Sequence, residues 1–394
     1  MQKRTVFAVC GCLMSLVVYA QSGDLEAILQ QVEQNNKELQ ALSSYVESKK
    51  LELKSGNNLP DPQLSAFYLP FGDHVGSDYS EFQLSQSFEF PSVYGARSEL
   101  IDEQVKKLEL EYQVKRQEVL LKAKQNYLEI IYLNKHLSLE EQRMEQSKTV
   151  FEQVQELFNK EQVGILEVNK AKVAWMQVQF KVSQVRADQQ SLLISLKELN
   201  GNTGLEIDHS DYLQTLELEG QETLWLDKLS KDPVLVSLQQ LETIAQQQLS
   251  LAKNTGLPNL TAGFNRQGIA GGYYSGVYAG ISIPLWSNKN KVPAANAQLE
   301  YQKVNTSAQT LKAEALYQKE FKQYGVLLGR YQEYETTLSG LNSEELLMQA
   351  YQLGEISFLE YHMELRFYRE AYDALLEVEL QLHQSKAELL KHQL

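Results

Sequence analysis

The sequence predicts a mainly α-helical fold with a small β part, built as a tandem duplication. Three observations lead to this fold class. Two stretches of about 100 residues carry apolar residues at helical spacing and have few helix breakers, which favours long coiled-coil helices. Four short runs alternate between apolar and polar residues and predict β-strands. The same order of segments occurs twice along the 394 residues.

Composition excludes several classes of protein. The 21 glycines and 8 prolines among 394 residues exclude collagen-like and low-complexity chains. There are 37 basic and 51 acidic residues, a net charge of −14, which argues against nucleic acid as a partner. The mean hydropathy is −0.38, and no run of 18 apolar residues follows the first 20 residues. A helical membrane protein is therefore excluded.

The first segment, 1–20, has the pattern of a secretory signal peptide that is removed from the mature protein. Two basic residues at positions 3 and 4 precede an apolar run over 6–18, and Ala20 precedes polar residues. The alternative is a buried first helix. Cys10 and Cys12 both lie in this segment, so the mature chain has no cysteine for a disulfide or a thiolate metal site.

Three pairs of matching motifs reveal the duplication. The Leu-Pro motif at Pro60 returns at Pro258, 198 positions later, and the proline after the second strand, Pro91, returns as Pro284, 193 positions later. The Leu-Glu pair at 166–167 returns at 359–360, again 193 positions later. We expect two copies of one unit that meet near 201–225.

Each copy begins with a helical segment. These segments, 21–58 and 201–256, are expected to hold helices over Leu25–Lys54 and Pro233–Lys253. Asp24 and Asp232 precede these helices as candidate N-caps. The second helix begins with Pro233, and proline at the first position suits a helix start.

Each copy ends in a long helical hairpin, and these occupy 92–200 and 287–394. The first has glycine only at Gly95 and Gly164, and a turn near Gly164 divides it into arms of about 70 and 36 residues. The second turns near 354–357, and Gly340 is one of three further glycines that make its longer arm the less regular one.

The segments 59–91 and 257–286 are expected to form two β-hairpins with loops at 74–77 and 268–272. Each hairpin is expected to have one apolar and one polar face. Aromatic residues gather at the strand ends. Strands of about ten residues with this pattern are typical of outer-membrane β-barrels, and the alternative is a soluble sheet packed on a helix. The residues predicted to face lipid are Phe82, Leu84, Phe88, Phe90, Val277, Ala279, Ile281 and Ile283. Those predicted to face the lumen are Glu81, Gln83, Ser85 and Ser87.

Four strands cannot close a barrel on their own, and an open sheet edge is not tolerated in lipid. Closure therefore demands several copies of the chain. Four strands per chain give 12 strands in a homotrimer, so the sequence predicts an oligomer in contact with outer-membrane lipid.

The order of segments and the motif Tyr351-x-x-Gly354-x-x-Ser357-x-Leu359-Glu360-Tyr361 resemble the TolC family of outer-membrane efflux proteins. The resemblance covers 24–390. The counterpart at 162–168 departs from the motif, since its glycine comes three residues later and it has no Ser or Thr. The Leu-Pro-Asp-Pro-Gln-Leu and Ser-Gln-Ser-Phe-Glu-Phe-Pro stretches resemble the branch that works with heavy-metal RND pumps.

The resemblance implies a trimer with a 12-stranded β-barrel in the outer membrane and an α-helical barrel in the periplasm. The helical tips would close like an iris and dock on a periplasmic adaptor that links the duct to an inner-membrane RND pump. The residues implied in docking and gating are Gly164, Leu166, Glu167, Gly354, Ser357, Leu359 and Glu360. Each glycine is expected to allow a tight turn at φ > 0, with a weak point in the helix as the alternative for Gly164. Glu167 and Glu360 either form a rim of carboxylates at the tips or are ordinary solvated residues of their helices.

The sequence predicts no enzyme, no cofactor and no high-affinity metal site. The six histidines include no pair three or four positions apart, and no phosphate loop or nucleophile motif occurs. The expected function is an outer-membrane exit duct of a tripartite RND-type system for heavy-metal cations. The alternatives are a drug or type I secretion duct, a soluble periplasmic coiled-coil scaffold, and an envelope hydrolase, for which no catalytic cluster is found.

Overall fold

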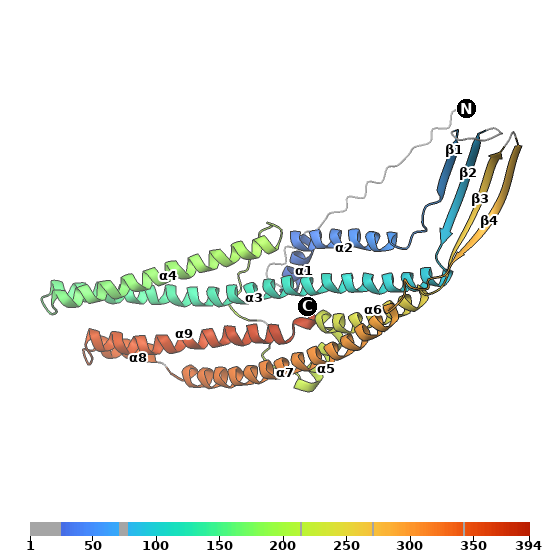
Figure 1. Cartoon of the computed structure of the whole chain (residues 1–394). Coiled ribbons are helices and arrows are strands. Elements are labelled where there is room, and N and C mark those ends of the chain that lie inside the picture. Colours follow the sequence, from blue (N-terminus) through green and yellow to red (C-terminus); the bar gives the residue numbers. More distant parts are fainter. Residues whose placement is uncertain (1–24, 71–77, 213–214, 270–271, 342) are drawn as a thin grey trace, which may run out of the picture.

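A computed structural model of the protein describes residues 25–70, 78–212, 215–269, 272–341 and 343–394. The molecule is elongated: four strands lie at one end, and helix α3 runs from them toward the far end, where it turns into α4 (Figure 1). The turn between α8 and α9 lies at the same far end (Figure 1). Among the described residues, no helix combines the length and the apolar character needed to cross a membrane. The predicted signal peptide and the candidate cap Asp24 lie outside the described residues.

The first helical segment is divided into two helices, which corrects the single helix expected over Leu25–Lys54. Helix α1 spans Leu25–Asn35 and α2 spans Lys37–Ser55. The break is at Asn36, whose side chain accepts a hydrogen bond from the amide of Leu39 and donates one to the carbonyl of Leu199. Because Asn36 accepts an N–H of the first turn that has no partner within the helix, it acts as the N-cap of α2.

The first long hairpin has the predicted form. Helix α3 spans Pro91–Asn159 (69 residues) and α4 spans Ile165–Leu199 (35 residues). The expected helical spacing is confirmed, since Val119, Ala123, Tyr127 and Ile130 are buried in one cluster with residues of α1 and α4. The proline at the start of α3 takes the first helical position, where a missing N–H costs nothing.

The second half repeats this order with more breaks. Helix α5 spans Gln221–Lys231 and α6 spans Pro233–Asn254, and the Asp232 carboxylate accepts the Val234 amide at 3.0 Å as predicted for an N-cap. The longer arm, α7 (Lys291–Ser339), ends before Gly340, and α8 (Ser343–Gln352) continues to the tip. Helix α9 (Phe358–Leu389) returns from it, and a short 3₁₀ helix, η1 (Lys391–Gln393), follows.

The strands form a single antiparallel sheet in the order β1-β2-β3-β4. They span β1 Gln63–Leu69, β2 Tyr79–Phe88, β3 Asn259–Ile269 and β4 Gly272–Ser282. The two hairpins are joined side by side, with Leu84 of β2 opposite both Leu64 of β1 and Phe264 of β3. The predicted loop at 74–77 lies outside the described residues. The second loop is shorter than the expected 268–272, because Gly268 and Gly272 both pair within strands.

Candidate functional site

The sheet has one apolar and one polar face, as the alternation predicted. On the apolar face, Phe82 of β2 is 55% exposed, Phe264 of β3 is 43% exposed and Val277 of β4 is 87% exposed. Large apolar side chains exposed on three successive strands form a continuous apolar surface, which marks a contact with lipid or protein.

The positions of the predicted lipid-facing residues agree with this face except at its edge. Six of the eight, including Leu84, Phe88 and Ala279, lie in β2 or β4. Phe90 follows β2 and is the N-cap residue of α3, and Ile283 follows the last residue of β4. Both therefore lie beyond the strands in which the sequence placed them.

The polar face carries a hydrogen-bonded network. Glu81 accepts hydrogen bonds from the Tyr79 hydroxyl at 2.5 Å and from the Asn265 amide at 2.6 Å. Gln83 donates to the Tyr278 hydroxyl at 2.5 Å, across the sheet. The Tyr278 ring covers Gly263, where a Cβ atom would lie 2.5 Å from the ring. Of the predicted lumen residues, Ser87 pairs with the Thr261 hydroxyl at 3.2 Å, and Ser85 lies opposite Gly263.

The tip of the second helical hairpin is held by a turn and a cap. Gly354 has φ +74°, the left-handed conformation that glycine adopts at little cost, as expected for a tight turn. Ser357 is the N-cap of α9 and forms a capping box with Glu360, whose carboxylate accepts the Ser357 amide at 2.8 Å. Hydrogen bonds from the backbone and the side chain of Ser357 lower the pKa of the exposed Glu360 carboxyl.

The tip of the first hairpin forms its turn differently, and the positive φ expected at Gly164 was wrong. Gly164 has φ −87° and is the N-cap residue of α4, so it uses none of the freedom of glycine. The left-handed residue is Glu161, with φ +58°. A positive φ at a glutamate gives no sequence signal, and so Glu161 escaped detection.

The two tips pack against each other through an apolar cluster of Val154, Val168, Phe358 and Tyr361 and their neighbours. Tyr351 of α8 stacks on Tyr361 with ring centroids 5.1 Å apart. Glu167 lines a pocket of about 450 Å³ together with Tyr351, Gly354 and Ser357, so the structure brings four of the predicted tip residues and motif positions together. Burial, followed by the charge of Glu167, raises the pKa of Tyr351.

Two of the predicted tip residues point outward. Leu166 is 71% exposed and Leu359 is 49% exposed, and both sit in the first turn of their helices. Each hairpin therefore has an exposed leucine beside its tip turn.

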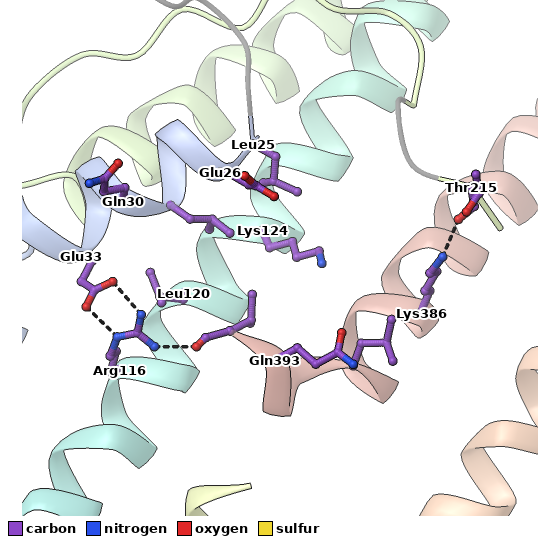
Figure 2. Close-up of a pocket in the computed structure, with 13 residues that line it drawn as sticks. Leu25, Glu26, Gln30, Glu33, Arg116, Leu120, Lys124, Thr215, Lys386 and Gln393 are labelled. Carbon is purple, nitrogen blue, oxygen red and sulfur yellow. Dashed lines mark hydrogen bonds and ion pairs between the residues drawn. The ribbon is translucent and has the colours of Figure 1, made fainter. Parts of the chain in front are cut away.

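A pocket of about 640 Å³ lies away from both sheet and tips, at the junction of α1, α3 and α9 (Figure 2). Arg116 closes one side by a paired contact with Glu33 at 2.7 Å, and Lys386 donates to the carbonyl of Thr215 on the other side (Figure 2). Burial, reinforced by the charge of Lys386, lowers the pKa of Lys124, which extends into the pocket (Figure 2).

A second charged cluster lies between α3 and α9, partly buried, and was not predicted from the sequence. That search considered only pairs of histidines, whereas His136 and Glu140 are one helical turn apart and Asp373 approaches them from α9. Arg143 bridges the two carboxylates at 2.5 Å and 2.7 Å. The pairing of a histidine with a glutamate four positions later was the available signal.

Sequence comparison assigns no relative: no model of a protein family matches the chain, and no curated protein matches it. Solved structures do match. CusC, studied for its folding and transmembrane channel formation, superposes with a TM-score of 0.78 at 14% identity over 95% of both chains. The CmeC outer membrane channel of Campylobacter jejuni gives 0.71 at 15% identity over 100% of this chain and 93% of its own. The outer membrane protein VceC of Vibrio cholerae gives 0.73 at 14% identity over 93% of this chain and 95% of its own.

These likenesses extend over nearly the whole chain, so they include the sheet, the long helices and both tips. The neighbours are channel proteins and not enzymes. At this level of identity the comparison concerns architecture. The chain therefore has the fold of TolC-like outer-membrane channels, which combine a barrel with long helices.

Proposed function

We propose that the protein is the outer-membrane exit duct of a tripartite RND-type efflux system and works as a homotrimer. The observation that carries the proposal is the two-faced sheet at one end of the long helices. Its apolar face exposes Phe82, Val277 and Ile281 and suits lipid, and its polar face is hydrogen-bonded around Glu81 and suits water.

The edges of the sheet support the trimer. Within the described residues, β1 pairs only with β2 and β4 only with β3, so each outer strand has one free edge. Free edges are not stable in lipid, and joining β4 of one copy to β1 of the next removes them. Three copies give 12 strands, an even number such as outer-membrane barrels have.

The tips support a docking and gating role. Each hairpin ends in an exposed leucine, Leu166 or Leu359, which suits contact with a periplasmic adaptor. Behind them, Glu167 and Tyr351 line one pocket between the two hairpins, so a shift of one hairpin changes this contact. Gating would be a movement of packed helices between two arrangements, biased by the adaptor and the inner-membrane pump.

We propose heavy-metal cations as the cargo. The net charge of −14 and the Glu81 carboxylate on the polar face favour cations, because an acidic lumen raises their local concentration. Deleting the gene should then lower tolerance to copper, silver, zinc, cobalt or cadmium. Unchanged metal tolerance with greater drug sensitivity would reassign the cargo to drugs.

A matched pair of strand variants tests the duct itself. Val277→Arg places a charge midway along β4 on the apolar face, where it costs about 2–4 kcal/mol in lipid, and should abolish a heat-sensitive trimer in the outer-membrane fraction. Ser85→Arg places the same side chain on the polar face and should keep the trimer while changing its ion selectivity in planar bilayers. A buffer-soluble monomer, or two variants that behave alike, would contradict the proposal.

A further inference from the structure

Three potential metal ligands converge between the two hairpins. His136 and Glu140 lie one turn apart on α3, and Asp373 reaches them from α9. The His136 Nε2 atom is 3.6 Å from the Glu140 Oε1 atom and 4.0 Å from the Asp373 Oδ1 atom. All three ligand atoms lie within 4.8 Å of one another.

The histidine is buried with its facing nitrogen unsatisfied. His136 is 4% exposed, and its Nε2 atom has no hydrogen-bond partner among the described residues. A buried polar atom without a partner costs about 1–3 kcal/mol. Because Nε2 faces two carboxylate oxygens from outside hydrogen-bond distance, a cation placed between the three atoms would satisfy all of them.

Arg143 now supplies that cation. Its Nη1 atom contacts Glu140 at 2.5 Å and Asp373 at 2.7 Å, while its Nη2 atom donates to the carbonyl of Arg369 at 3.3 Å. The Arg143 Nε atom has no partner among the described residues. A pocket of about 240 Å³ lined by Arg143, Gln177 and Glu370 adjoins the cluster and gives the guanidinium room to move aside.

We propose that His136, Glu140 and Asp373 form a binding site for a divalent transition-metal ion, which replaces Arg143 as the cation that bridges α3 and α9. One imidazole nitrogen with two carboxylate oxygens suits zinc, cobalt or nickel, whereas magnesium and calcium prefer oxygen alone. Bonds of about 2.0–2.1 Å in a tetrahedral site place ligand atoms about 3.4 Å apart, so small side-chain shifts suffice. The site lies between helices of one chain, away from the polar strand face, and does not depend on the proposed duct function.

Zinc and cobalt titrations of the full chain test the site. The protein is purified in detergent without a polyhistidine tag, and binding is followed by calorimetry with Zn²⁺ and by the visible absorption of Co²⁺. We expect one tight ion per chain, with Mg²⁺ failing to compete. His136→Gln should weaken binding at least tenfold, and His209→Gln, a half-buried histidine outside the cluster, should leave it unchanged.

Arg143→Gln separates a metal site from a merely structural cluster. Removing the competing guanidinium should tighten Zn²⁺ binding, a gain that no purely structural role of Arg143 produces. Asp373→Asn provides a second ligand variant in case His136→Gln does not fold, because the Asp373 side chain is 36% exposed. The proposal is overturned if Asp373→Asn binds Zn²⁺ as tightly as the natural protein, or if Arg143→Gln binds no more tightly.

Discussion

Gly164 occupies in the first helical hairpin the place that Ser357 occupies in the second. Both are N-cap residues of the helix that returns from the tip, with ψ of 161° in each case. They lie 193 positions apart, the same offset that separates Pro91 from Pro284. The left-handed residues Glu161 and Gly354 also differ by 193 positions. The backbone of the tip is therefore duplicated, while its side chains have exchanged roles.

Cap exchange between the tips is the first prediction. Ser357→Ala removes a side-chain cap and should cost about 1 kcal/mol, a roughly fivefold rise in local opening of the second tip. Gly164→Ser supplies a cap three residues before Glu167 and should stabilise the first tip by a few tenths of a kcal/mol. Amide hydrogen exchange at the two tips measures both effects, and equal exchange in Ser357→Ala and the natural protein would contradict the assignment.

Exchange of the left-handed residues is the second prediction. Gly354→Ala forces a Cβ atom into φ +74° and should destabilise the second tip by about 1 kcal/mol. Glu161→Gly relieves φ +58° and should stabilise the first tip by up to about 1 kcal/mol. Because nothing lies within 4 Å of the Cβ position at Gly354, the effect there reports backbone strain alone. Protease cleavage rates at the tips should change in opposite directions.

These residues show what the sequence could and could not predict. Repeat order, helix length and strand alternation are local patterns, so the arms of α3 and α4 and the two faces of the sheet were predictable. The positive φ expected at Gly164 was wrong because the composition of a turn does not say which of its residues has positive φ. The break at Asn36 depends on the distant carbonyl of Leu199, and the cluster around His136 depends on Asp373, 237 positions away. Such contacts require the tertiary fold.

Loss of stability in acid is the third prediction, through His383. This histidine is 4% exposed and stacks on Tyr212, and burial, helped by nearby lysines, lowers its pKa from 6.5 to about 4. Between pH 6.5 and pH 4 the unfolded chain therefore binds a proton at His383 that the folded chain does not bind. The stability that neutral His383 contributes to the folded state is complete above pH 6.5 and is lost as the pH falls toward 4. By pH 5 the loss should reach about 2 kcal/mol.

Unfolding of the detergent-solubilised protein at pH 7.5 and pH 5 measures this loss. His383→Gln should reduce the difference in unfolding free energy between the two pH values. Burial also lowers the pKa of His362 and of His392, so some acid sensitivity should persist in the His383 variant. A His383 variant with the full difference would rule out this histidine as a source.

The fourth prediction concerns the junction between the end of α4 and the break before α2. Gly201 has φ +62°, and a Cβ atom there would lie 2.3 Å from the carbonyl oxygen of Asn35. Gly201→Ala should therefore cost about 2 kcal/mol or more, because neither backbone can move freely. Gly204→Ala is the matched control, since nothing lies within 4 Å of its Cβ position. Thermal unfolding should separate the two alanine variants by several degrees.

The last prediction separates the two possible roles of Glu360. The Glu360 carboxylate accepts a hydrogen bond from the Ser357 amide. Charge reversal by Glu360→Lys therefore removes both the negative charge and this capping hydrogen bond, so reduced efflux in that variant could follow from either loss. Glu360→Gln removes only the charge, because glutamine also completes a capping box. If the charge contacts the adaptor, Glu360→Gln should weaken both adaptor binding and efflux while the trimer and the hydrogen exchange of the tip stay unchanged. If the Glu360→Gln variant supports efflux as well as the natural protein and only Glu360→Lys reduces it, the carboxylate acts only as a helix cap. Contact with the adaptor would then be assigned to the exposed Leu166 and Leu359.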